Sequence, residues 1–373
     1  MKQSADDLPL GSRPGSPHGP AHGRGAPSNP ANRFERLHVV VDEEVEAAPR
    51  GEEDSDDGRV ETRYLRDTSR SVITTNTSPD VGFDASLNPY RGCEHGCVYC
   101  YARPTHEYLG FSAGLDFESR ILVKEDAPEL LARELDSPRW KPQVLALSGV
   151  TDPYQPVERK LEITRRCLAV LAERRNPVGV VTKSSLVARD ADHLAELASH
   201  GAAVVAVSVT TLDPELARRM EPRAPHPRER LKAISKLAAA GVPVTVMAAP
   251  VVPGLTDHEI PAILEAAAEA GATGAGYVML RLPGAVSGLV EEWLEVHFPD
   301  RKEKVLNRVR GLRGGRLNDP RFGSRMRGEG PFAEQVKALF ESAKRRFGLD
   351  RPRPDPSTAA FRRPGGEQMG LFG

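Results

Sequence analysis

Residues 178–209, "VGVVTKSSLVARDADHLAELASHGAAVVAVSV", contain one complete strand–helix–strand unit. The unit begins and ends with continuous β-branched runs at 178–182 and 203–209, which are typical of strands buried on both faces of a parallel sheet. Between them, residues 192–201 place apolar side chains at helical spacing and end at a glycine. This order of elements predicts a parallel βαβ unit.

The same unit repeats along the chain. Further apolar runs occur at 144–148, 244–249 and 276–280, and a short strand is expected near 84–91. Helical sequence fills the gaps, and one helix starts where Thr256 and Glu259 have capping-box spacing. About six βα units over roughly 210 residues are fewer than the eight of a complete barrel. The pattern therefore predicts an α/β fold, either a barrel or an open doubly wound sheet.

The N-terminal part has a different composition. Residues 1–33 contain 11 Pro plus Gly, and residues 42–61 contain 10 Asp or Glu against 2 Arg. Neither stretch holds enough apolar side chains for a core, so residues 1–61 are predicted to be a disordered tail. The α/β domain is expected to span residues 62–285.

The C-terminal part is helical and basic. Helices are predicted within residues 286–349, and residues 301–363 hold 18 Lys or Arg against 7 Asp or Glu. Residues 350–373 are rich in Pro and Gly and are predicted to form a second disordered tail.

The overall composition excludes several classes of protein. The formal net charge is −1, so bulk charge indicates no partner. No apolar run approaches the roughly 18 residues that span a bilayer, and the N-terminus has no apolar region typical of a secretory signal. The 4 cysteines are unevenly placed, which argues against a disulfide framework. We expect no membrane partner and a reducing, cytoplasmic location.

Cys93, Cys97 and Cys100 have the spacing Cys-x3-Cys-x2-Cys. A zinc site with His95 as fourth ligand is one interpretation, although structural zinc sites usually pair two ligand clusters and only one is present. Inert thiols are another. A four-iron cluster held by three thiolates would leave one iron open for a substrate or cofactor. The fourth cysteine, Cys167, lies at helical spacing from apolar residues and is predicted to be a core thiol.

This motif, placed before the first helix of a βα array, resembles the radical S-adenosylmethionine (SAM) superfamily. The resemblance implies a partial (β/α)6 TIM-like barrel, with Cys93, Cys97 and Cys100 holding a [4Fe-4S] cluster whose open iron binds SAM. It also implies reductive cleavage of SAM to a 5′-deoxyadenosyl radical, with electrons from a donor such as flavodoxin or ferredoxin.

The resemblance also suggests residues that bind SAM and cluster at the carboxyl ends of strands. These are Ser148, Gly149 and Thr151 in "SGVTD", Lys183 in "VVTKSS", Ser208, and Arg230 in "EPRAPHPRERLKAI". The alternatives are a helix-capping loop for "SGVTD", a surface lysine for Lys183, and a solvated helix face for Arg230.

A closer resemblance is to spore photoproduct lyase and its relatives. "CVYCY" places Tyr99 and Tyr101 on either side of Cys100, and Glu221 lies in a matching place. That lyase carries a hydrogen-donor cysteine after its second strand, whereas the corresponding "LSGVTDPYQP" here has none. The two tyrosines are therefore the candidate catalytic residues, as alternative hydrogen donors.

The resemblance and the basic extension favour a nucleic-acid substrate, as in a DNA repair lyase. Two alternatives remain open: a radical SAM enzyme acting on a small molecule or peptide, and a non-catalytic iron–sulfur protein that binds nucleic acid. The chain ends "GEQMGLFG". Gln368, Leu371 and Phe372 resemble the short peptides by which repair proteins bind the DNA sliding clamp, and an idle tail is the alternative.

Overall fold

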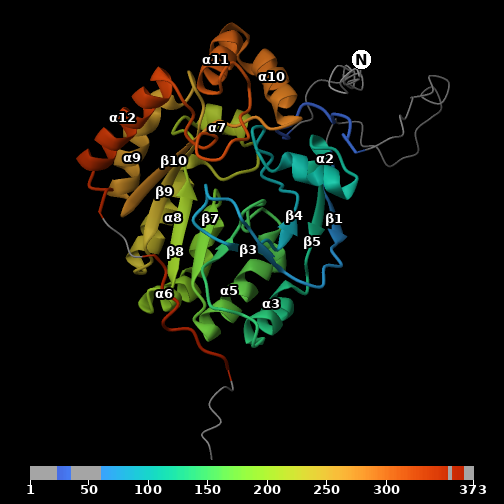
Figure 1. Ribbon diagram of the computed structural model, residues 1–373, viewed down its shortest axis with the longest axis vertical. Coiled ribbons are helices and arrows are strands. Elements are labelled where there is room, and N and C mark those ends of the chain that lie inside the picture. Colours follow the sequence, from blue (N-terminus) through green and yellow to red (C-terminus); the bar gives the residue numbers. More distant parts are fainter. Residues whose placement is uncertain (1–22, 35–59, 352–354, 365–373) are drawn as a thin grey trace, which may run out of the picture.

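The computed structural model describes residues 23–34, 60–351 and 355–364 (Figure 1). Within these ranges the main sheet has seven strands in the order β10-β9-β8-β7-β6-β3-β2. Its strands are β2 (Ile73–Thr75), β3 (Ala85–Leu87), β6 (Leu145–Leu147), β7 (Val178–Thr182), β8 (Ala203–Ser208), β9 (Val244–Val251) and β10 (Gly274–Met279). Strand β2 pairs antiparallel with β3, and the remaining pairs are parallel. The predicted parallel α/β fold is confirmed.

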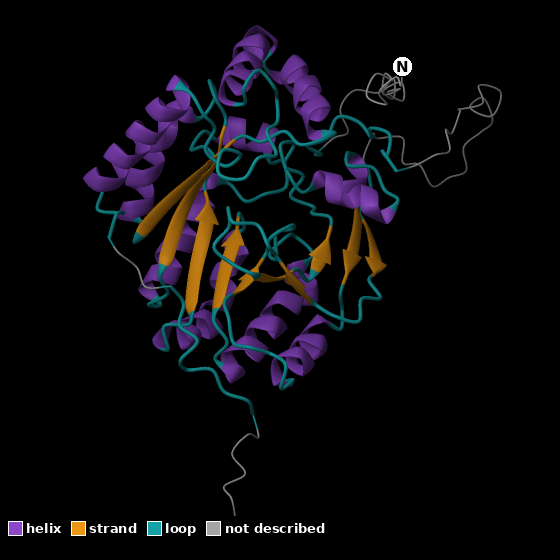
Figure 2. Cartoon of the chain, in the orientation of Figure 1, coloured by secondary structure: helices purple, strands orange, loops and turns teal. Residues whose placement is uncertain are grey.

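The parallel strands follow chain order from β3 to β10 without the reversal that marks a doubly wound sheet. The connecting elements are η1 (Arg103–Leu109), α2 (Leu115–Ser119), α3 (Ala127–Asp136), α4 (Glu158–Leu161), α5 (Ile163–Arg174), η2 (Ser185–Asp190), α6 (Ala191–Ser199), α7 (Pro214–Met220), α8 (Pro227–Ala239), η3 (Asp257–Glu259) and α9 (Ile260–Glu269). Apolar side chains of α5, α6, α8 and α9 share one core with the strands, which explains why these strands are continuous apolar runs (Figure 2).

A second, small sheet lies beside the first. It consists of β1 (Arg63–Arg66), β5 (Arg120–Val123) and β4 (Tyr90–Arg91), in the order β1-β5-β4. Strand β4 leads directly into the first of the three clustered cysteines. The small sheet therefore fixes the start of the cysteine-containing loop.

The predicted C-terminal helices are present as α10 (Val286–His297), α11 (Pro299–Leu312) and α12 (Pro331–Arg346). Figure 1 shows α10 and α11 over the upper ends of the central strands. Their apolar faces form one cluster with Cys97, Tyr99 and Leu280, and α12 packs on β10 with Phe340 4.6 Å from the Tyr277 ring. The boundary expected at residue 285 therefore does not separate two cores.

Both predicted tails contain segments that pack on the core, which corrects the expectation of disorder for these residues. Residues 23–34, here called the N-terminal segment, bury Ala26 and lie against the cysteine region. Residues 355–364 lie near the amino ends of the strands, where Ser357 N donates to Gly201 O at 2.8 Å and Arg362 N donates to Arg174 O at 2.9 Å. Composition predicted disorder because these segments contribute few apolar side chains; backbone hydrogen bonds hold them instead.

No helix among the described residues is long and apolar enough to cross a membrane.

Candidate functional site

Residues 92–101, here called the cysteine loop, follow β4 and are almost entirely buried. Cys93 and Cys97 are each 8% exposed, and Cys100 is partly exposed. Two tight turns shape the loop, because Gly96 N donates to Cys93 O at 3.4 Å and Cys100 N donates to Cys97 O at 3.2 Å. These turns bring three thiols that are close in sequence into one small region.

The three thiols suit a cation that stabilises thiolates. All three are free, and burial raises the pKa of each, so without a cation they stay protonated. Cys97 and Cys100 also raise the pKa of Cys93, and Cys100 raises the pKa of Cys97, as expected for neighbouring thiols. A cluster of soft, buried thiols is the donor set that iron–sulfur clusters use, so these residues fit a [4Fe-4S] cluster.

The zinc interpretation takes His95 as the fourth ligand. Its Nδ1 lies 3.3 Å from the Asp152 carboxylate, so the imidazole faces that acid. In the described part of the chain, no three Cys, His, Asp or Glu side chains are close enough together to hold one metal ion. A [4Fe-4S] cluster does not require three side chains around a single ion, because each thiolate binds a different iron.

A buried ion pair contacts the cysteine loop. Arg103 and Glu118 are both fully buried and paired, and Arg103 Nε donates to Cys97 O at 2.9 Å. The same Glu118 carboxylate accepts hydrogen bonds from Gly25 N at 3.0 Å and Ala26 N at 2.7 Å. The N-terminal segment is thus attached to the pair that holds the loop.

Gly25 is required for this attachment. A Cβ atom built at residue 25 would lie 1.6 Å from Gly96 O, so any side chain there would collide with the cysteine loop. Glycine allows the two backbones to approach closely.

A second buried ion pair lies next to Tyr99. Arg230 pairs with Glu221, and its Nη1 donates to Ser208 O at 3.2 Å. The Tyr99 hydroxyl donates to the same Glu221 carboxylate, which also accepts from Thr210 at 2.6 Å. Burial would raise the pKa of Glu221, but Arg230, Lys183 and these hydrogen bonds outweigh it and lower the pKa to about 2. Arg230 is 1% exposed, so the alternative of a solvated helix face is wrong.

Lys183 lies at the carboxyl end of β7 and reaches across β8. Its Nζ donates to Ala249 O at 3.2 Å and lies 5.8 Å from the centre of the Tyr99 ring. Its charge also lowers the pKa values of Cys97 and Cys100, although burial raises both more strongly. No carboxylate of the described residues is within ion-pair distance of Lys183, so its ammonium is available to an anionic group.

The predicted "SGVTD" stretch forms a loop, residues 148–152, that joins several strand ends. Ser148 has a φ of 110°, and its hydroxyl donates to Thr151 O at 3.0 Å. The Thr151 hydroxyl donates to Tyr90 O at 3.0 Å. The Tyr101 hydroxyl donates to Gly149 O, which connects this loop to the cysteine loop. Tyr101 is 51% exposed, whereas Tyr99 is 8% exposed.

Asp152 is a member of the site that sequence reasoning missed. Its carboxylate accepts from Thr182 Oγ1 at 2.7 Å and from Lys183 N at 2.7 Å, and it faces His95. Burial would raise its pKa, but His95 and these donors lower it to about 2. The sequence pattern that could have identified Asp152 is its place at the end of "SGVTD", directly after the predicted SAM-binding residues.

Most of the other predicted site residues lie close to the cysteine loop. The structure brings Tyr99, Tyr101, Gly149, Lys183 and Ser208 to the carboxyl ends of the strands around the cysteine loop. Cys167 is fully buried in the main core, which confirms its prediction as a core thiol. Gln368, Leu371 and Phe372 lie outside the described residues.

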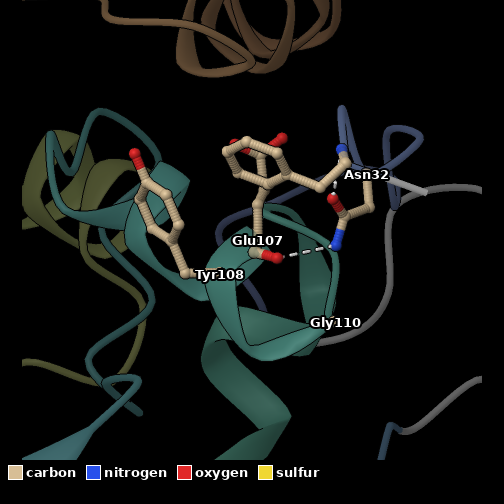
Figure 3. A pocket seen from close by; sticks show the side chains of 5 residues that line it. Asn32, Glu107, Tyr108 and Gly110 are labelled. Carbon is tan, nitrogen blue, oxygen red and sulfur yellow. Dashed lines mark hydrogen bonds between the residues drawn. The ribbon is translucent and has the colours of Figure 1, made fainter.

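A pocket lies between the N-terminal segment and η1. It has a volume of about 340 Å³ and is lined by Asn32, Phe34, Glu107, Tyr108 and Gly110. Figure 3 shows Asn32 donating to the Glu107 backbone oxygen at its edge, at 2.9 Å. None of the three clustered cysteines lines it, so it is distinct from the thiol site.

The family model described as "Radical SAM superfamily" matches residues 87–267, which include the cysteine loop and strands β4 to β9. The chain belongs to the radical SAM superfamily. An uncharacterized protein of Mycobacterium tuberculosis is 38% identical over 283 residues, covering 75% of this chain and 80% of the relative. An uncharacterized protein of Methanocaldococcus jannaschii is 28% identical over 46% of this chain and 62% of that protein.

Solved structures of spore photoproduct lyase, a radical SAM enzyme, have the same fold. One, a variant with bound AdoMet and dinucleoside spore photoproduct, has a TM-score of 0.55 and 15% identity, covering 76% of this chain and 78% of the lyase. Another, with the dinucleoside photoproduct, has a TM-score of 0.54 at 15% identity, covering 76% and 79%. At this identity the likeness shows the fold alone.

Proposed function

We propose that the protein is a radical SAM enzyme in which Cys93, Cys97 and Cys100 hold a [4Fe-4S] cluster. The observation that carries the proposal is the buried loop of three free thiols, held between two ion pairs at the carboxyl ends of the strands. When bound, the cluster supplies the electron that cleaves SAM. Arg103 fixes the loop through Cys97 O, and the N-terminal segment covers it, so this chain excludes water from the thiols.

We further propose that Lys183 binds the carboxylate of SAM. Its ammonium lies near the thiols and has no carboxylate partner among the described residues, while Asp152 fixes its backbone. Ser148, Gly149 and Thr151 form the adjoining loop, which Tyr101 holds against the cysteine loop. Ser208 and Arg230 act indirectly, because Arg230 uses its donors on Glu221, Ser208 O and Pro225 O. In this proposal the six sequential parallel strands serve as a partial (β/α)6 barrel around the cofactors.

We assign Tyr101 in preference to Tyr99 as a hydrogen donor to the substrate. The hydroxyl of Tyr99 is buried against Glu221, whereas Tyr101 is half-exposed beside the cysteine loop. A substrate at the carboxyl ends of the strands can reach Tyr101 without opening the core. The missing cysteine in residues 147–156 makes such a donor necessary if the chemistry follows that of the lyase.

Nucleic acid is the substrate class that we propose. The fold is shared with a lyase whose structure holds a dinucleoside photoproduct, and residues 301–363 carry 18 Lys or Arg against 7 Asp or Glu. The tail residues Gln368, Leu371 and Phe372 are proposed to bind the DNA sliding clamp, and a flavodoxin or ferredoxin is proposed as the electron donor. A titration of the clamp with a peptide of residues 364–373, beside one with Leu371→Ala and Phe372→Ala, tests the clamp contact.

The experiment that tests the enzyme is anaerobic reconstitution with iron and sulfide, followed by reduction and incubation with SAM. Formation of 5′-deoxyadenosine by the wild type, and none by Cys97→Ala, is expected. Binding of a DNA oligonucleotide should then weaken steeply as salt rises, because each neutralised phosphate releases counterions. Turnover of SAM without salt-dependent DNA binding would instead favour a small-molecule or peptide substrate. DNA binding without 5′-deoxyadenosine would favour a non-catalytic iron–sulfur protein.

A further inference from the structure

The two edges of the parallel array are bridged by one short segment, residues 323–326, here called the rim segment. At one edge, Met279 N of β10 donates to Met326 O at 2.9 Å. At the other edge, Asp80, which lies between β2 and β3, accepts from Gly323 N at 2.7 Å and pairs with Arg325. The opening between β10 and β3 is therefore bounded by this segment.

Three arginines gather at this opening, and only one has a carboxylate partner among the described residues. Arg325 pairs with Asp80. Arg313 is 3% exposed and donates to three backbone oxygens, those of Leu280 at 2.9 Å, Ser324 at 3.1 Å and Arg325 at 2.7 Å. Backbone oxygens satisfy these donors but do not neutralise the charge.

Arg281, the second residue after β10, is the least engaged of the three. Within the described residues its guanidinium contacts the Met326 sulfur at 3.6 Å, a weak acceptor, and the Tyr101 ring at 5.7 Å from the ring centre. Its buried Nε has no hydrogen-bond partner. A half-buried guanidinium without a carboxylate is unusual, because burial of charge is normally compensated.

Electrostatics supports the same conclusion. Burial and the neighbouring Arg281 lower the pKa of Arg313 to about 10. Burial and Arg325 lower the pKa of Arg281, although Tyr101 and Asp80 act in the opposite direction. The two guanidiniums thus repel each other in a partly desolvated place, and an anion bound between them and solvent would relieve this cost.

The arginines at this opening lie next to the cysteine loop. Tyr101 lies under Arg281 and directly follows Cys100, and its hydroxyl is bonded to Gly149 of the loop after β6. Pro104 and Gly284 also meet here, since a Cβ at residue 284 would lie 3.5 Å from Pro104 Cγ. A group bound to Arg281 would sit beside the side chain that we assign as hydrogen donor.

We propose that Arg281, reinforced by Arg313 and with Tyr101 beneath it, binds a phosphate group of the substrate. The proposal rests on the proposed function and specifies how the substrate is held at that site. The planar guanidinium donates two parallel hydrogen bonds to two oxygens of one phosphate, and two cations without an ion-pair partner among the described residues match its negative charge. The phosphate belongs either to a free nucleotide or to the backbone of a nucleic acid.

The test measures binding by calorimetry to the reconstituted full chain with SAM. The probes are thymidine monophosphate, the dinucleotide TpT, and the neutral methylphosphonate analogue of TpT. Wild type should bind a charged probe at least tenfold more tightly than the neutral analogue. Arg281→Gln should abolish this preference, and Arg281→Lys should keep part of it. Arg139→Gln is the matched control, because Arg139 is an exposed arginine before β6, at the opposite end of the strands.

The outcomes are distinct. Tight binding of the monophosphate identifies a free nucleotide as the source, whereas tight binding of TpT alone identifies a backbone phosphate. Equal affinity for charged and neutral probes, no binding of any probe, or an unchanged preference in Arg281→Gln would overturn the proposal. Formation of 5′-deoxyadenosine is measured on the same samples. Its presence in a protein that fails the binding test refutes the phosphate site alone, and its absence refutes the proposed enzyme.

Discussion

The arginines on the two sides of the cysteine loop differ in how their charge is compensated. Next to the loop, Arg103 and Arg230 are fully buried, and each pairs with a buried glutamate. At the opening between β10 and β3, Arg281 and Arg313 are partly or wholly buried with no carboxylate partner among the described residues. Compensated pairs hold a structure in place, whereas uncompensated charge is poised for a ligand. The predictions below test this distinction.

The largest effect is expected for the cysteines that the paired region supports. Cys93→Ala, Cys97→Ala or Cys100→Ala should each remove the iron of the anaerobically reconstituted protein, because three thiolates are the minimum that holds the cluster. Iron analysis and the visible absorption spectrum measure this loss. Cys167→Ala is the control and should keep its iron. Stoichiometric zinc with no iron in the wild type would refute the cluster.

Breaking one compensated pair should be costly for stability. Glu118→Gln leaves Arg103 buried and unpaired, so the free energy of unfolding should fall by about 3–5 kcal/mol. Arg281→Gln removes a charge that has no partner, and should change this free energy by less than about 1 kcal/mol. Urea denaturation of both variants measures the contrast. Similar losses in the two variants would show that the distinction has no energetic basis.

A smaller effect is expected when the proposed contact between Lys183 and SAM is removed. Lys183→Ala should weaken SAM binding by about 1.5–3 kcal/mol, the range for a hydrogen bond to a charged group. Equilibrium dialysis with labelled SAM measures the dissociation constant. Lys160→Ala, at an exposed position in α4, should leave it unchanged. An unchanged constant in Lys183→Ala would return Lys183 to a purely structural role.

The smallest effect concerns pH. Folding lowers the pKa of Asp152 from 3.8 to about 2, so the stability from this shift is complete above pH 4 and is lost as the pH falls toward 2. The shift is worth about 2 kcal/mol. Between pH 5 and pH 2 the free energy of unfolding should therefore fall by about 2 kcal/mol less in Asp152→Asn than in wild type. Urea denaturation across this pH range measures the difference. Parallel pH profiles would show that the carboxylate is not perturbed.

The sequence predicted the strands best. Strands β7, β8 and β9 match the expected runs closely. The expected burial on both faces is incomplete, because buried side chains alternate with less buried ones in β7 and Val181 is 42% exposed. The three cysteines were found because their ligands are local. The N-terminal segment was missed, since Gly25 and Ala26 reach Glu118 across 93 and 92 residues and no local pattern encodes such contacts.

The sequence pattern gave a wrong prediction where a polar side chain has both a local and a distant hydrogen-bond partner available. The spacing of Thr256 and Glu259 predicted a capping box. In the structure the Glu259 carboxylate accepts instead from Thr211 Oγ1 at 2.6 Å and Leu212 N at 2.7 Å, in the loop after β8. The Thr256 hydroxyl accepts from Val252 N at 2.9 Å. A sequence pattern cannot show which of two partners a side chain takes once the chain has folded.

The docking of the N-terminal segment has a consequence for how this chain can vary. The segment behaves as a peptide ligand that is covalently attached to its own receptor, so its effective concentration there is on the order of millimolar. A single methyl group at Gly25 would collide with Gly96 and would therefore release this internal ligand from its binding site.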